Sequence, residues 1–237
     1  MLLYSSAGLL VLFAVTSNVA LAQTNAPAPT AGQSPNTQPP IAQPEDKRIF
    51  WIVPNYRTAP IPRPYEPLIP KEKFKIASED AFDRGSVALA VLFAGEAQLT
   101  NSTPAFGQGV KGYAQYLGAA YGDLVIGDMM TEAIYPVMLH QDPRYFRRGT
   151  GAVWLRLGSA VGQIFWTHAD SGKTQINYSE IVGNSTAVAI STAYYPNNRT
   201  AGDAVSKLGV QLGVDMAANI LKEFWPDINR KFSRKSQ

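Results

Sequence analysis

Both histidines of this chain are followed, two positions later, by an aspartate. His140 precedes Asp142 in the run HQD, and His168 precedes Asp170 in the run HAD. Imidazoles and carboxylates can bind a metal together, or a carboxylate can orient a histidine that acts as a base. Both pairs, however, fall at predicted helix ends, where aspartate caps a helix and histidine favours the negative end. We therefore predict no catalytic residue, no metal and no cofactor, and keep a metal-dependent or hydrolase-like site at these four residues as the alternative.

Three arginines follow the first pair in the run HQDPRYFRRGTG. If Asp142 caps a helix that opens at Pro143, Arg144, Arg147 and Arg148 share one face of that helix. Three guanidinium groups beside a glycine-rich loop form a candidate site for a phosphate or carboxylate. The interpretation that we prefer is pairing within the chain, with acids of the preceding segment. Those acids are Asp123, Asp128 and Glu132.

The first 22 residues are typical of a secretory signal peptide. The apolar run GLLVLFAVTSNVALAQ ends in small residues, and Ala20-Leu21-Ala22 fits the A-x-A rule, which predicts cleavage after Ala22. The alternative is an N-terminal membrane anchor. The chain has no cysteine, so disulfides and thiolate metal sites are excluded. Export without disulfides favours the periplasm or an outer-membrane association in a Gram-negative bacterium.

Proline divides the chain before the helices begin. Residues 23–70 hold 12 of its 17 prolines. Residues 23–49 are predicted to be a disordered spacer, because their composition cannot bury enough apolar surface to fold. Residues 50–70 add aromatic side chains, and we expect them to lie extended against the folded body, or to form one short edge strand.

Residues 71–228 are predicted to form one helical domain, followed by a basic tail at 229–237. A solvated helix opens it, and Thr200 with Asp203 resembles a capping box. A bend or a helix end is expected near Pro136. The fold class is mainly α, a single bundle of about five or six glycine-rich, closely packed helices. The predicted apolar helical segments are 84–99, 109–140, 151–168, 178–196 and 200–226.

Glycines recur at a spacing of four within three of these segments. Glycine costs a helix roughly 1 kcal/mol relative to alanine, so the repetition predicts that these positions let two helix backbones approach closely. The pairs are Gly118/Gly122, Gly158/Gly162 and Gly209/Gly213.

The charges inside these helices disfavour a membrane span. Asp123, Asp128 and Glu132 lie in one segment, and Lys207 and Asp215 in another. A charge at the centre of a bilayer costs about 2.5–3.5 kcal/mol even on the lenient insertion scale. A membrane-embedded bundle with a transport or pore role therefore remains an alternative only.

The end of the chain combines basic and aromatic residues. The run KEFWPDINRKFSRKSQ has five basic and two acidic residues, with Phe224, Trp225 and Phe232 among them. Such a segment can contact anionic lipid headgroups, and a solvated terminus is the alternative. Nucleic acid is a poor partner for an exported chain. We predict a non-enzymatic envelope protein, peripheral to a membrane or bound to an envelope protein partner.

The runs IVPNYRT, HQDPRYFRRGTG, AYYPNNR and KEFWPDINRK together resemble a group of uncharacterised bacterial proteins that are predicted to be secreted to the envelope. The resemblance covers roughly residues 50–232, nearly the whole exported domain. It implies a location and a domain boundary. It implies no activity and carries over no catalytic residue.

Overall fold

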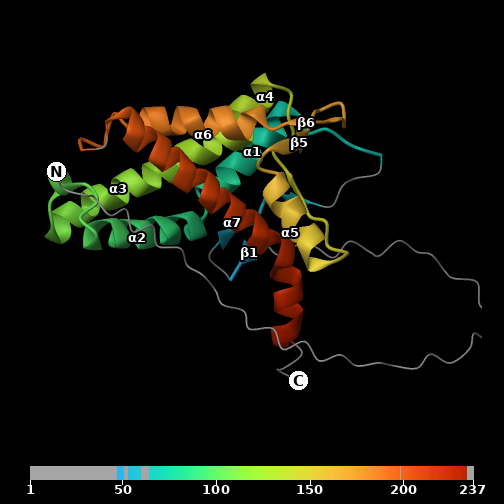
Figure 1. Ribbon diagram of the computed structural model, residues 1–237, viewed down its shortest axis with the longest axis horizontal. Helices are drawn as coiled ribbons and strands as arrows, with labels where there is room; N and C mark the ends of the chain where they lie inside the picture. The colour runs from blue at the N-terminus through green and yellow to red at the C-terminus, as the bar shows by residue number, and fades with distance from the viewer. Residues whose placement is uncertain (1–46, 51–52, 60–63, 198, 234–237) are drawn as a thin grey trace, which may run out of the picture. The chain divides into compact units, whose positions relative to one another are not determined.

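The computed structural model describes residues 47–50, 53–59, 64–197 and 199–233. This part of the chain is mainly helical, which confirms the predicted helical bundle (Figure 1). The predicted signal peptide and the spacer up to residue 46 lie outside the described residues.

The helices and the 3-10 turn between them follow one another along the chain. They are α1 (Pro70–Ala81), α2 (Arg84–Leu99), η1 (Pro104–Phe106), α3 (Gly109–Asp128), η2 (Met129–Ile134), α4 (Tyr135–Met138), α5 (Val153–Gly162), α6 (Tyr178–Ser191) and α7 (Ala201–Ser233).

Six short strands pair in twos. β1 (Arg48–Ile49) is antiparallel to β2 (Val53–Pro54), and β5 (Trp166–His168) is antiparallel to β6 (Thr174–Ile176). β3 (Thr58–Ala59) is parallel to β4 (Tyr145–Phe146), with Thr58 opposite Tyr145. The last pair joins the segment before the helices to the middle of the chain.

The helices differ in detail from the predicted segments. The segment predicted as 109–140 changes to π-helical geometry at η2 and ends at Met138, near Pro136 as expected. The segment predicted as 151–168 ends at Gly162, and its last residues form β5. The segment predicted to end at 226 continues through Pro226 to Ser233.

Side-chain caps fix several helix starts. The Asp83 carboxylate accepts from the Gly85 N–H at the start of α2, and the Asn177 side chain accepts from the Glu180 N–H at the start of α6. The predicted capping box is confirmed at α7, where the Thr200 hydroxyl accepts from Asp203 N–H and the Asp203 carboxylate accepts from Thr200 N–H.

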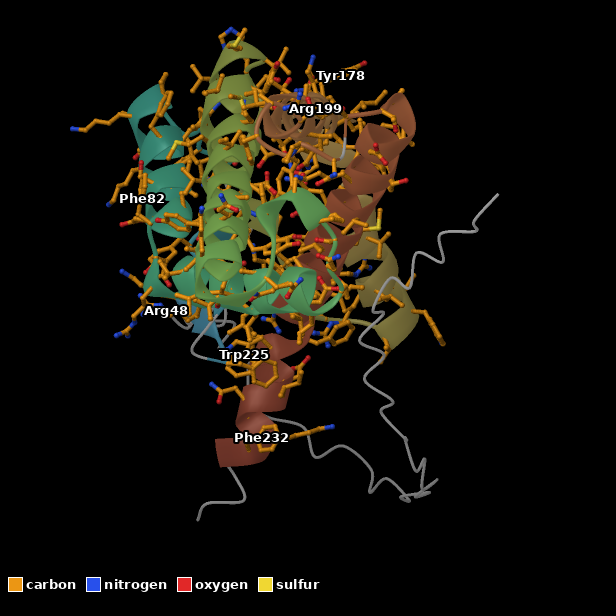
Figure 2. The ribbon with its side chains drawn as sticks, turned by 90° about the vertical axis from the view of Figure 1, so that its left-hand side faces the viewer. Arg48, Phe82, Tyr178, Arg199, Trp225 and Phe232 are labelled. Carbon is orange, nitrogen blue, oxygen red and sulfur yellow. The ribbon has the colours of Figure 1, made fainter. Side chains whose placement is uncertain are left out.

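The helices pack around an interior of small side chains. α2 lies along α3, α6 lies beside η2, and α7 crosses α6 and then runs beside α5 (Figure 1). The last turns of α7, which carry Phe232, extend beyond the other helices (Figures 1 and 2). Alanine supplies most of the buried apolar side chains, including Ala77, Ala90, Ala94, Ala133 and Ala160. Helices can approach closely over alanine, and a few larger side chains, such as Tyr116 and Ile164, are buried with them.

Glu223 of α7 joins three separate segments inside this interior. Its fully buried carboxylate accepts from the Tyr145 hydroxyl at 2.9 Å, the Gly149 N–H at 2.8 Å and Arg156 Nε at 2.8 Å. It also accepts from the Arg148 N–H at 2.9 Å. One carboxylate therefore positions β4, the glycine-containing loop after it and the start of α5.

Replacing Glu223 with alanine should lower the free energy of unfolding by about 3–5 kcal/mol, since it leaves the buried Arg156 charge without its main partner. Urea denaturation measures this loss. The control is Glu96→Ala on the exposed side of α2, which should stay within about 0.5 kcal/mol of the wild type. Equal effects for the two substitutions would contradict the assignment.

Candidate functional site

The structure brings the two His-x-Asp pairs side by side. Gln141 and Ala169 form an antiparallel bridge. The Asp142 N–H donates to the His168 carbonyl at 2.8 Å, and the Asp170 N–H donates to the His140 carbonyl at 2.8 Å. The pairs therefore meet through their backbones, although they are far apart in the sequence.

Their side chains bind different partners. The Asp142 carboxylate accepts from Arg144 Nη2 at 2.6 Å and from the Tyr65 hydroxyl at 2.5 Å. The Asp170 carboxylate accepts from the buried Lys73 Nζ at 2.7 Å. Each acid is thus engaged by a cation, as expected for a structural ion pair.

The histidines differ in their surroundings. The His140 side chain is 84% exposed, with Nδ1 3.8 Å from the Asp170 carboxylate, and its backbone has a φ of 52°. The His168 ring stacks on Tyr65, with ring centroids 5.8 Å apart, and meets the edge of Phe146. No group of three or more histidine or carboxylate side chains within the described ranges has the geometry to hold a metal ion.

The three arginines do not form one clamp. Arg144 pairs with Asp142 and donates to the Glu66 carbonyl at 2.7 Å, whereas Arg147 Nε donates to the Glu223 carbonyl at 3.0 Å. The Arg148 side chain is exposed. The helix predicted to open at Pro143 is absent, because the chain pairs with β3 as strand β4 instead.

The acids that we expected to pair with these arginines have other partners. Asp123 accepts from Lys207 Nζ at 2.8 Å and from the Tyr195 hydroxyl at 2.8 Å. Glu132 lies 3.2 Å from Arg57 Nη1. The prediction was therefore right that these acids need partners inside the chain, and wrong about Arg144 as a partner.

The predicted close packing of the glycine pairs is wrong within this chain. A Cβ added at most of them would meet no heavy atom within 4 Å, and at Gly122 it would meet only Tyr194, at 3.8 Å. The positions with open space are Gly118, Gly158, Gly162, Gly209 and Gly213. A tight contact between two helical segments is found at Gly183 instead, where a Cβ would come within 2.9 Å of the Thr131 methyl group.

A buried charge network, which the sequence analysis missed, lies at the centre of the bundle around Arg57. Arg57 is buried, with Nη1 3.2 Å from Glu132 and 4.0 Å from Glu180. Burial opposes the charge on Arg57, but the two carboxylates outweigh it and raise the pKa of the guanidinium. Arg57 comes from the segment between β2 and β3, and its carboxylate partners come from η2 and α6.

Three further acids and one lysine surround this group. They are Asp80, Asp128, Asp215 and Lys222. Burial raises the pKa of Asp80, and burial together with the neighbouring Asp80 raises the pKa of Asp128 and Glu132 well above the ordinary value. Burial and the adjacent Asp215 raise the pKa of Glu180 to about 8. The network contains five acids and only two cations, so some of its carboxyl groups stay protonated at neutral pH.

A polar cavity of about 20 Å³ adjoins Arg57 and Glu180. Thr131, Ser179 and Asn219 also line it, together with the strand segment 142–145. A space of this size is large enough for one water molecule. The cavity is too small for a substrate of metabolite size. Its lining is polar and continues the buried charge network around Arg57.

A weak sequence signal pointed to this network. Asp128 and Glu132 are four residues apart, as are Glu180 and Asn184, and such spacing places both side chains on one helix face. Nothing in the proline-rich segment singled out Arg57, because an extended segment has no periodicity that reveals which side chain turns inward.

Comparisons with known proteins add no function. No protein-family model, curated protein sequence or solved structure matches this chain. Among the described residues, no helix is long and apolar enough to cross a membrane.

Glu180→Gln should flatten the pH dependence of stability. Glu180 has a folded-state pKa of about 8 and an ordinary value of 4.5 when unfolded. Between these two pH values the Glu180 carboxyl holds its proton in the folded state and has lost it in the unfolded state. The stabilisation that this proton provides is therefore fully present below about pH 4.5 and is lost as the pH rises toward about 8. Glutamine mimics the protonated carboxyl and should remove this decline.

Urea midpoints from about pH 5 to about pH 9 measure the effect. The exposed Glu96→Gln serves as the control. A Glu180→Gln protein that loses as much stability as the wild type over this range would show that Glu180 is ionised in the folded state.

Proposed function

We propose that this protein is a non-enzymatic, exported envelope protein that attaches peripherally to the surface of a membrane. The observation that carries the proposal is the distribution of side chains, with several charged groups buried inside the bundle and many large apolar groups exposed on it. Exposed apolar patches of this kind mark surfaces that bind proteins or membranes.

The outer side of α2 carries several large apolar side chains. Leu92 is 60% exposed and Leu99 is 89% exposed. Val87, Val91 and Phe93 are exposed on the same helix. A water-facing helix normally presents polar side chains on its outer face, so α2 is built to contact something apolar.

The outer side of α7 shows the same composition in its first half. Val205, Val210 and Val214 are exposed, and Gly209 and Gly213 lie open between them. The glycines predicted to pack within the chain therefore lie on a smooth outer surface that an apolar partner can approach closely.

The candidate catalytic groups support a structural role. Asp142 is held by Arg144 and Tyr65, and Asp170 is held by Lys73. A general base needs a free lone pair directed at a substrate, and both of these carboxylates are already engaged.

Export is supported by the apolar run of residues 1–22 with its small-residue end.

Flotation with lipid vesicles tests the proposal. The protein, purified after export, should rise with vesicles of phosphatidylcholine and phosphatidylglycerol, because apolar and basic side chains both contribute to binding. High salt should weaken the association and leave the helix content unchanged. Failure to float with any vesicle would reject a membrane surface, and crosslinking in the envelope would then identify a protein partner.

A further inference from the structure

We infer that one end of the bundle, formed by the first turn of α5 and the last turns of α7, is the surface that binds anionic lipid headgroups. We call it the α5–α7 tip and define it by Arg148, Val153, Trp154, Leu155, Arg230, Lys231 and Phe232. The inference rests on the proposed membrane function and assigns the lipid class and the contacting residues.

The first turn of α5 is unusually apolar for an exposed helix start. Val153 is 61% exposed, Trp154 is 80% exposed and Leu155 is 57% exposed. These residues form no part of the core, since Arg156 is the side chain of this turn that faces α7. Tryptophan and aliphatic side chains in this setting favour the boundary between headgroups and acyl chains.

Arg156 holds the two halves of the tip together. Its Nε lies 2.8 Å from the Glu223 carboxylate, its Nη1 lies 2.6 Å from Asp227, and its guanidinium lies 4.4 Å from the centre of the Phe224 ring. Asp227 also pairs with Arg230, one turn further along α7. The exposed start of α5 is therefore fixed beside residues 223–227 of α7, and the last turns of α7 continue past it (Figure 1).

The charge of the tip is complementary to an anionic surface. Residues 147–156 and 223–232 contain five basic and two acidic residues. Both acids, Glu223 and Asp227, are bound by Arg156. Arg148, Arg230 and Lys231 are exposed, so the charge that reaches solvent is positive. Phe232, 64% exposed on the turn that extends past the other helices, adds a second apolar group (Figure 2).

This combination separates the tip from the other apolar surfaces. The exposed side of α2 carries one basic and one acidic residue, Arg84 and Glu96, so it has no net attraction for anionic lipid. The exposed half of α7 from Val205 to Val214 presents valine and glycine without an exposed cation. A net positive charge beside exposed apolar side chains occurs only at the tip, among the surfaces compared.

The experiment measures binding to vesicles of phosphatidylcholine with phosphatidylglycerol and to vesicles of phosphatidylcholine alone. Trp154→Asp should weaken binding at least about tenfold, because it places an anion where an apolar ring entered the interface. The double variant Arg148→Gln, Lys231→Gln should weaken binding to the anionic vesicles alone, by roughly 30-fold, since each cation near an anionic surface contributes about a fivefold factor. Ile176→Asp, at an exposed position of β6 that has no part in the surfaces compared, is the matched control and should bind as the wild type does, whereas Leu92→Asp tests the exposed side of α2.

Each outcome has a distinct meaning. Lost binding in Leu92→Asp with retained binding in Trp154→Asp would overturn the tip and leave the proposed membrane function standing. Equal binding of the wild type to both vesicle types would overturn the anionic preference. No binding by the wild type would overturn the proposed function itself.

Quenching of tryptophan fluorescence by brominated phosphatidylglycerol keeps the test independent of the aspartate substitution. Brominated lipid should quench the wild type, and the conservative Trp154→Phe should remove most of that quenching while retaining vesicle binding. Unchanged quenching in Trp154→Phe would show that another tryptophan enters the lipid, and would overturn the tip.

Discussion

Charge burial is the constraint on which this structure depends. Most of the helices carry a charged side chain into the interior, and each of these charges needs a partner or a proton there. Arg57 pairs with the acids of η2 and α6, Lys73 pairs with Asp170, and Arg156 pairs with Glu223. These pairs link segments that are far apart in sequence, so they fix the arrangement of helices that small alanine side chains alone would leave weakly specified.

The same constraint accounts for the composition of the outer surface. Alanines and ion pairs occupy much of the interior, and many large apolar residues, such as Leu92, Trp154 and Val210, are exposed. A soluble helix usually shows the reverse arrangement. The bundle thus has specific polar contacts inside it and exposes part of its large apolar side chains.

The helices were predictable from sequence because their signals are local. The apolar run at 84–99, the apolar spacing within 151–168 and the Thr200–Asp203 box act over a few residues and need no tertiary contact. The β3–β4 pair and the inward turn of Arg57 were not predictable, since each depends on residues that lie far along the chain. The glycine spacing was misread because a sequence shows that two backbones can approach, and does not show whether the partner belongs to the same chain.

The parallel pairing of Thr58 with Tyr145 has a consequence for the order of folding. Its partners are 87 positions apart, and the helices α1 to α4 lie between them. Closing so long a loop costs entropy before any contact offsets it. We therefore expect the helices to assemble first and the N-terminal segment to dock late. Arg57 would then enter an interior whose carboxyl groups have until that step been protonated or hydrated.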